Sequence, residues 1–143
     1  MVTKAAPWNY KPKKRWGLWS RFLIGVEGDP YLDRLSIITT PWFSIKLHRI
    51  YRPDRQRELH DHPWTFLSLI LWGHYLEHTV SGLRRRFWFN WKRAEDRHSI
   101  CEVSRSPVWT LVICGPSRRE WGFWVDDGTR FVQWREYEKL YGA

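Results

Sequence analysis

A chain of 143 residues, 43% of them hydrophobic and 17% aromatic, can pack one domain and is too short for two ordinary ones. Its formal net charge of +9 favours anionic partners. No stretch approaches the ~20 apolar residues of a membrane helix, and the N-terminus lacks the apolar region of a secretory signal. We therefore expect no transmembrane segment and a cytoplasmic protein. Cys101 and Cys114 fit no zinc-finger or disulfide spacing, so we expect both to be reduced core thiols.

The first 26 residues contain no acidic side chain. Their basic residues are interleaved with aromatic ones: Lys4, Trp8, Tyr10, Lys11, Lys13, Lys14, Arg15, Trp16, Trp19 and Arg21. This mixture suits nucleic acid, through phosphate contact and base stacking, or an anionic membrane surface; it equally suits a solubilising arm that folds back onto the domain. We expect residues 1–30 to form a basic aromatic segment, which could be helical at about residues 16–24. The domain would occupy residues 31–143.

The rest of the chain is predicted to be β-structure with tight turns. Short runs rich in β-branched and aromatic residues recur at 35–40, 43–51, 65–72, 74–80, 84–91, 98–103, 108–114, 120–125 and 130–134. Ser81-Gly82 is a hairpin signal, and a further helix is expected only at the extreme C-terminus. So many short strands at regular intervals indicate an all-β sandwich or barrel.

His60 and His62 precede the most apolar of these runs. On an extended strand, residues two apart project to the same face, so both imidazoles could reach one metal ion. The pair alone would equally suit two polar side chains at the mouth of a core strand. Its surroundings add a longer pattern: Asp54, five residues, His60-Asp61-His62, three residues, Phe66, six residues and Gly73.

This pattern resembles the first motif of the cupin superfamily, in which glycine, H-x-H, glutamate and glycine follow at these intervals. Asp54 replaces the first glycine, a mild change because Asp tolerates turn conformations. Phe66 replaces the usual glutamate ligand and cannot bind a metal. The second cupin motif supplies one more histidine, for which "RAEDRHSICEV" offers His98.

The phrases "LHRIYRPD", "HDHPW" and "WTLVICGPSRREWGF" are also similar to small cupin-like proteins of bacteriophages and actinobacteria. The resemblance implies a double-stranded β-helix, or jelly-roll barrel, with a metal at His60, His62 and His98. If the chain is encoded by a phage, its compartment would be the host cytoplasm.

Three histidines would leave the charge of a divalent metal uncompensated and its other positions open, which favours an anionic or chelating substrate. Such a site resembles the iron sites of thiol dioxygenases. The resemblance thus implies an iron-dependent oxygenase acting on a small anionic or thiol substrate. Fe(II) is the expected metal; Zn, Mn and Ni also accept imidazole ligands.

Other side chains are open to two interpretations. Tyr75 could line the pocket or fill the core. Arg118 and Arg119 could orient an anionic substrate, or could lie on a solvated turn. His48 lies on a predicted strand, where it could approach the pocket or be a core residue with its own partner.

Alternatives to an oxygenase also stay open. The chain could be a non-catalytic, phage-type binding or virion-associated module that uses its basic aromatic surface, nucleic acid included. It could instead catalyse metal-assisted isomerisation or hydrolysis, with Glu58, Asp61, Glu77 or Tyr75 as general base. The resemblance to cupin barrels also implies a possible homodimer through outer strand faces, which would give some of the twelve tryptophans a place.

Overall fold

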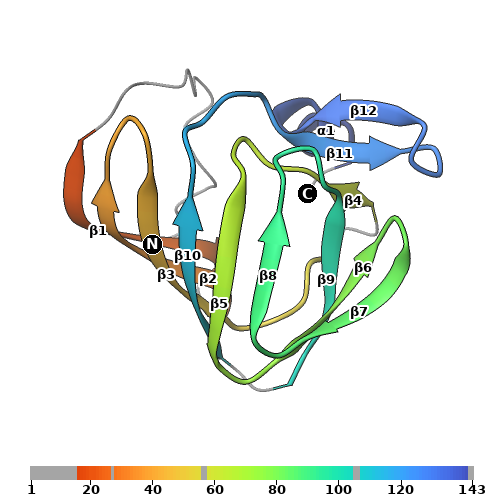
Figure 1. The fold of residues 1–143 in the computed structure, drawn as a ribbon. Helices are drawn as coiled ribbons and strands as arrows, with labels where there is room; N and C mark the ends of the chain where they lie inside the picture. Colours follow the sequence, from red (N-terminus) through yellow and green to blue (C-terminus); the bar gives the residue numbers. More distant parts are fainter. Residues whose placement is uncertain (1–15, 27, 56–57, 105–106, 142–143) are drawn as a thin grey trace.

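The computed structural model describes residues 16–26, 28–55, 58–104 and 107–141. In these ranges the chain forms twelve strands and one short helix, arranged as two six-stranded antiparallel sheets (Figure 1). Sheet 1 has the strand order β1-β2-β3-β10-β5-β8, and sheet 2 has the order β12-β11-β4-β9-β6-β7. The prediction of an all-β jelly roll is confirmed. No helix in the described ranges is long and apolar enough to cross a membrane.

Sheet 1 contains β1 (Gly17–Val26), β2 (Asp29–Thr39), β3 (Ser44–Ile50), β5 (Phe66–Trp72), β8 (Phe89–Lys92) and β10 (Val108–Cys114). Sheet 2 contains β4 (Leu59–His60), β6 (Tyr75–Thr79), β7 (Gly82–Arg86), β9 (His98–Val103), β11 (Gly122–Val125) and β12 (Arg130–Gln133). Helix α1 (Trp134–Tyr141) follows β12, as expected for the C-terminus.

The helix expected at about residues 16–24 is wrong, because these residues lie in β1, which pairs antiparallel with β2. Ile24 stands opposite Leu32 in this pairing and packs against the core. The strand therefore gains a hydrogen-bond ladder along most of its length and apolar contacts, which override local helix propensity. Residues 1–15, which carry most of the basic aromatic segment, lie outside the described ranges.

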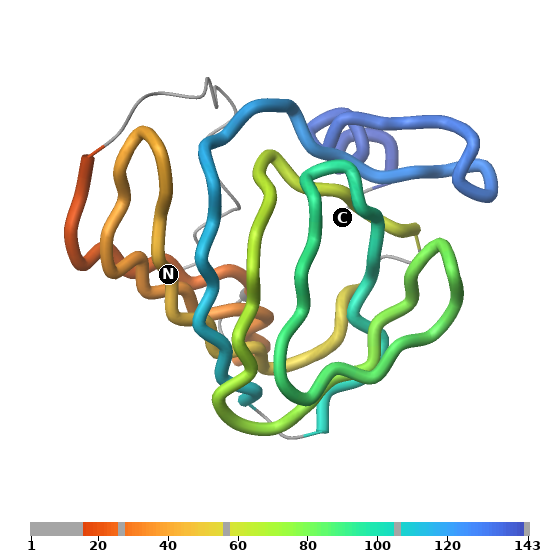
Figure 2. Tube along the Cα trace, viewed as in Figure 1, coloured from red at the N-terminus to blue at the C-terminus, as the bar shows by residue number. Residues whose placement is uncertain are grey.

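The run predicted at residues 84–91 divides between the two sheets. Residues up to Arg86 belong to β7 in sheet 2, and Phe89 begins β8 in sheet 1. Figure 2 shows the chain turning between these two strands. Phe87 and Trp88 form the crossing and are exposed. The crossing brings β8 opposite β6, which positions the polar residues of the candidate site.

The two sheets pack face to face through an apolar cluster at one part of the interior. Leu32, Ile50 and Val108 from sheet 1 meet Tyr75 and Ile100 from sheet 2. A second cluster lies where α1 packs on β11 and β12; it consists of Phe123, Val125, Val132, Trp134 and Tyr137. Burial of this apolar surface is the main stabilising contribution to the fold.

On β8 the inner face of sheet 1 is polar, and the outer face is apolar. Asn90 and Lys92 on β8 are buried, whereas Phe89 and Trp91 are 57% and 56% exposed. The reason is that Asn90 and Lys92 reach across to a carboxylate of β6, Glu77. The barrel interior therefore offers charged and hydrogen-bonding groups to whatever it encloses.

Candidate metal centre

Three histidines converge on the inner face of sheet 2. His60 ends β4, His62 lies in the loop that follows, and His98 begins β9 directly opposite His60. One ring nitrogen from each can be chosen so that all three lie within 4.8 Å of one another. The Nε2 atoms of His62 and His98 are 3.2 Å apart. The structure thus brings together the three histidines singled out in the sequence.

The residue between the paired histidines, Asp61, points the other way, toward β11. Asp61 is fully buried, and its Oδ1 accepts a hydrogen bond from the backbone N–H of Gly122 at 2.9 Å. Its Oδ2 accepts a hydrogen bond from the indole of Trp124 and pairs with Arg119, each at 2.9 Å. The carboxylate therefore anchors the two-residue strand β4 to β11 and directs both imidazoles inward.

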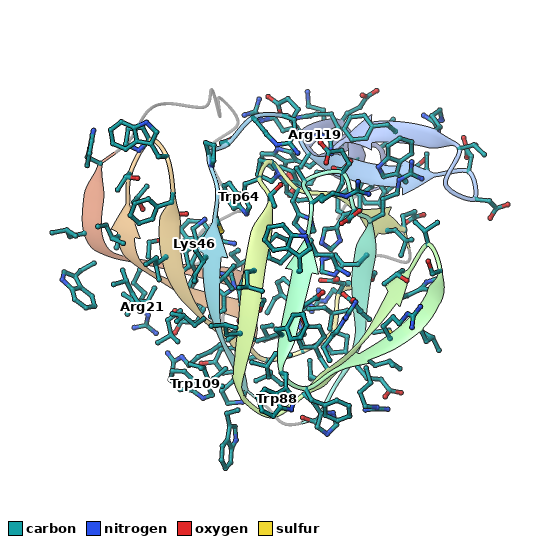
Figure 3. All side chains as sticks on the ribbon, in the orientation of Figure 1. Arg21, Lys46, Trp64, Trp88, Trp109 and Arg119 are labelled. Atoms are coloured by element: carbon teal, nitrogen blue, oxygen red, sulfur yellow. The ribbon has the colours of Figure 1, made fainter. Side chains whose placement is uncertain are left out.

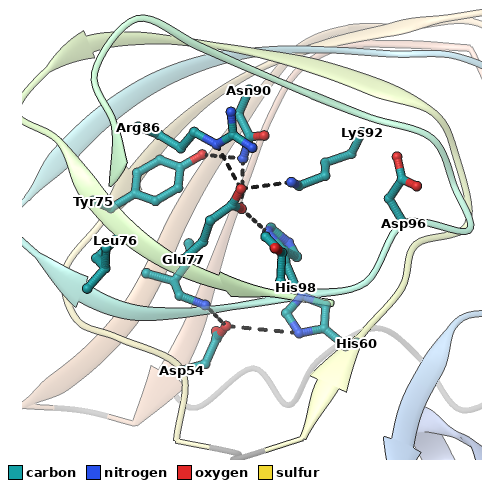
Figure 4. Close-up of polar contacts among 12 residues, drawn as sticks. Asp54, His60, Tyr75, Leu76, Glu77, Arg86, Asn90, Lys92, Asp96 and His98 are labelled. Atoms are coloured by element: carbon teal, nitrogen blue, oxygen red, sulfur yellow. Dashed lines mark hydrogen bonds and ion pairs between the residues drawn. The ribbon is translucent and has the colours of Figure 1, made fainter. Parts of the chain in front are cut away.

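His98 is oriented by Glu77 on the neighbouring strand β6 (Figure 4). The Nδ1 atom of His98 lies 2.6 Å from Oε2 of Glu77. If Nδ1–H donates this bond, the lone pair of Nε2 is left facing the other two histidines. This is the arrangement by which a carboxylate orients a metal-binding imidazole.

Glu77 itself is fully buried among hydrogen-bond donors. Lys92 Nζ and Arg86 Nε each donate to its Oε1 at 2.8 Å, and Asn90 donates to its Oε2 at 3.0 Å. Burial opposes ionisation, but the hydrogen bonds from His98 and Lys92 and the charge of Lys92 outweigh it and hold the pKa of Glu77 well below its usual value. The sequence signal for this role was an acid in the middle of a short strand, where a carboxylate is buried only with partners.

The other two imidazoles are held in their neutral forms. Burial, the largest cause, lowers the pKa of His60 to about 4 and that of His62 well below its ordinary value. His62 Nδ1 is buried and has no hydrogen-bond partner among the described residues. Neutral imidazole is the form that binds metal, so both side chains keep a lone pair available.

Asp54, at the position of the first cupin glycine, lies behind His60. Its Oδ2 accepts the backbone N–H of Ile100 at 2.7 Å and is 4.0 Å from His60 Nδ1. The Tyr31 hydroxyl donates to Oδ1 of the same carboxylate. Asp54 therefore ties the loop before β4 to β9, close to where β9 presents His98.

Phe66 supplies an apolar wall at the position of the usual glutamate. Its ring centroid lies 4.7 Å from that of His62 and 6.4 Å from that of His98. Trp121 and Phe123 flank His60 at 6.1 and 6.0 Å. The cluster therefore offers three nitrogen ligands beside aromatic side chains, a donor set that suits a divalent transition metal.

No family model matches this chain, and no curated protein matches it. Several solved structures match it in fold. A cupin 2 conserved barrel domain protein from Rhodopseudomonas palustris superposes with a TM-score of 0.60 and 12% identity, over 83% of this chain and 86% of that one. The fold is a cupin barrel.

Two further matches are structures of enzymes. Pac13 of Streptomyces, a nucleoside dehydratase, matches with a TM-score of 0.55 and 10% identity over 87% of this chain and 97% of that one. A structure of the DMSP lyases RdDddP and RnDddQII matches with a TM-score of 0.50 and 14% identity, over 71% of this chain and 53% of that one. At these identities the likeness concerns the fold.

The other three side chains considered for the site, Tyr75, Arg118 and Arg119, lie in different parts of the cupin barrel. Tyr75 is buried, and its hydroxyl accepts a hydrogen bond from Asn90 at 2.9 Å; burial raises its pKa. Arg119 is engaged by Asp61, on the side of β4 opposite to the imidazoles. Arg118 is exposed and pairs with Glu95 at 2.7 Å. Among the described contacts neither arginine bonds to a histidine of the cluster, although the charge of Arg119 is close enough to contribute to the lowered pKa of His62.

The three acids considered as general bases have different partners. Glu77 alone contacts a histidine of the cluster, since Asp61 faces β11 and Glu58 accepts a hydrogen bond from Tyr137 on α1 at 2.5 Å. The two thiols are free, as expected, but only Cys114 is buried; Cys101 is exposed, which corrects the expectation of two core thiols. Cys101 lies an odd number of residues after His98 on β9 and therefore occupies the opposite strand face.

Proposed function

We propose that this protein is a mononuclear metal-dependent enzyme of cupin fold, which binds a divalent metal through His60, His62 and His98 and acts on a small anionic substrate. The observation that carries the proposal is the convergence of three imidazoles whose tautomers and charges suit metal binding. His98 is oriented by a buried carboxylate, and the low pKa values of His60 and His62 keep both neutral. We expect the protein to act in the cytoplasm, that of the host if a phage encodes it.

Fe(II) is the metal we favour, with Zn, Mn and Ni as alternatives, because all four accept imidazole ligands. A bound metal would supply a Lewis acid with open positions for substrate, and iron would add redox capacity. The chain contributes the rest. Phe66, Trp121 and Phe123 restrict water around the imidazoles, and Glu77 holds His98 in one orientation.

The leading reaction is oxygenation of a small anionic or thiol substrate. It is supported by the absence of a carboxylate from the three-histidine cluster in the described residues, which leaves the charge of a divalent metal available to bind an anion. A dehydration or elimination is the alternative reaction, because similarly folded structures include a nucleoside dehydratase and DMSP lyases. Tyr75 and Glu77 are then the acid–base candidates.

Elemental analysis tests the metal assignment directly. The protein should be purified without chelator or affinity-tag metal, as wild type, as His98→Ala and as His78→Ala, a control that removes an exposed histidine of β6. We expect one metal ion per chain in the wild type and the control, and none in His98→Ala. Stoichiometric metal in His98→Ala would remove the assignment. Oxygen consumption with thiols and small carboxylates then separates oxygenation from elimination.

A second candidate is a non-catalytic binding module, and the outer face of sheet 1 favours it. Exposed apolar side chains cover this face on three adjacent strands: Leu71 and Trp72 on β5, Phe89 and Trp91 on β8, and Ile113 on β10. Apolar surface of this kind commonly marks an interaction site. A second copy of the chain is the partner we favour, so this module would be a homodimer.

The solution mass by light scattering tests this candidate. Wild type should run as a dimer, and Trp91→Ser should run as a monomer with unchanged metal content. A monomeric wild type would exclude the homodimer. Nucleic-acid binding through the basic N-terminal segment is tested separately by deleting residues 1–15, which leaves β1 intact.

A further inference from the structure

A lysine is buried in the inner face of sheet 1, and no residue that the structure describes is its counter-ion. Lys46 on β3 is 6% exposed, and its Nζ lies 3.6 Å above the ring centroid of Trp64 (Figure 3). Among the described residues, no carboxylate lies within ion-pair distance of this amine. Buried lysines are rare unless they are paired, because removing the ammonium from water is costly. The cation–π contact with Trp64 offsets only part of that cost.

The surroundings of Lys46 add positive charge. Arg34 on the adjacent strand β2 stands opposite His48 of β3. His48 is two residues after Lys46, so Arg34 lies on the same face of sheet 1 as Lys46. Its Nε donates to His48 Nε2 at 3.0 Å, and burial, with the charges of Arg34 and Lys46, keeps the pKa of His48 well below its ordinary value. Burial and the nearby Arg34 lower the pKa of Lys46 to about 7, an effect that the Cys114 thiol partly opposes.

A hydroxyl without a partner completes the cluster. Thr110 on β10 stands opposite His48 and therefore on the same inner face as Lys46. It is 1% exposed, and its Oγ1 has no hydrogen-bond partner among the described residues. A buried donor of this kind normally has a protein or ligand partner. Arg34, a lysine that a bound anion would keep protonated and an unsatisfied hydroxyl lie on one inner face, and such groups bind an anionic oxygen.

We infer that the inner face of sheet 1 holds an anion subsite in which Lys46, Arg34 and Thr110 bind the carboxylate or phosphate group of the ligand. The inference rests on the proposed function in one respect, that the other end of the same ligand reaches the histidines. Trp64 links the two places, since it follows His62 by two residues, packs with Phe66 and lies under Lys46. Lys46 on β3 is then a further candidate for the role considered for Arg118 and Arg119.

Calorimetric titration with sulfate and with malonate tests this subsite, and metal-free protein keeps the test independent of the histidines. Sulfate stands for a phosphate group and malonate for a carboxylate, so the tighter binder identifies the ligand class. The variants are Lys46→Met, which preserves the stem over Trp64, and Lys139→Met, which removes an exposed lysine of α1 as a control. We expect Lys46→Met to weaken binding about tenfold or more, as for loss of a charge-assisted hydrogen bond, and Lys139→Met to leave it unchanged.

Two further variants separate this inference from the metal proposal. Thr110→Val, which keeps shape and removes the hydroxyl, should weaken the binding of the same anion. His62→Ala should lose metal and still bind the anion, so failure of the metal site leaves the subsite standing. Folded Lys46→Met with wild-type affinity would overturn the inference, as would metal-free wild type that binds neither anion. If Lys46→Met does not fold, the comparison of Thr110→Val with wild type decides.

Discussion

Glu77 Oε2 lies 2.6 Å from Nδ1 of His98, and both side chains are buried. The same carboxylate is the acceptor for Lys92 and Arg86, which come from the strands on either side of the crossing at Phe87 and Trp88. One acid therefore orients a candidate metal ligand and neutralises charge from both sheets. The geometry of the histidine cluster depends on it.

Glu77→Gln should lower metal affinity by roughly 10- to 100-fold, as expected when the carboxylate behind a metal-binding histidine is lost. The amide can still accept a bond from His98, but it cannot balance Lys92 and Arg86. Competition with a chromogenic chelator measures the affinity. Glu102→Gln, which changes an acid that is 65% exposed on β9, is the control and should behave as wild type.

The buried cations left by Glu77→Gln could also destabilise the fold, by about 3–5 kcal/mol for a broken buried pair. The double variant Glu77→Gln/Lys92→Met removes one of them and should recover part of the stability without recovering metal affinity. Wild-type metal affinity in either folded variant would show that Glu77 has a structural role alone.

Phe66→Glu should raise metal affinity, because the side chain at this position already lies against His62 and faces His98. A carboxylate there would add a charged fourth ligand to three neutral imidazoles. Phe66→Gln has nearly the same shape without the charge and is the matched comparison. Equal affinities for the two variants would mean that position 66 does not reach the metal.

The metal-free protein should lose stability as the pH falls from 6.5 toward 4. The folded-state pKa of His60 is lowered from 6.5 to about 4, and those of His48 and His62 are also lowered, chiefly by burial. In this window the unfolded chain binds more protons than the folded chain, so acid favours unfolding. Urea unfolding across the window measures the slope. Bound metal should steepen it toward pH 4, because metal and protons compete for the same imidazoles, and a slope unaffected by metal would contradict the assignment.

Lys46→Met should raise the free energy of unfolding, most strongly below pH 7. The pKa of Lys46 falls from 10.5 to about 7 on folding, so below pH 7 the folded protein carries the full cost of a buried ammonium. Between pH 7 and 10.5 the folded state is neutral at this site while the unfolded chain remains protonated, and the advantage of Met shrinks. Unfolding midpoints across this range, in buffer without sulfate or phosphate, check the direction. A stability difference that grows with pH would contradict it.

Sequence patterns predicted the parts of this protein that depend on neighbours along the chain. Alternation placed His60 and His62 on one face, and the resemblance to the second cupin motif pointed to His98. The parts that depend on partners across the barrel were missed. Glu77 can lie buried beside His98 because Lys92, from another strand, comes to lie opposite it.

The same limit explains two other differences. The stretch around Trp19 has helix-compatible residues, but β2 provides a pairing edge that no local signal shows. On β8, Phe89 and Trp91 alternate with Asn90 and Lys92 in the sequence. Asn90 and Lys92 face inward because they bond to Glu77 on β6. Burial of a polar set requires the partner to be known.

Asp61 also makes the candidate metal centre and the C-terminal hairpin one cooperative unit. Strand β4 has two residues, and its hold on β11 includes the contacts of Asp61 with Gly122 and with the Trp124 indole. Separation of β11 from β4 would therefore free His60 and His62 to move, and metal binding to these histidines would keep β11 paired with β4. Metal should accordingly slow hydrogen exchange at the Trp124 indole, which points away from the ion. Metal binding at the histidines would thus stabilise the β11–β12 hairpin and the helix α1 that packs on it.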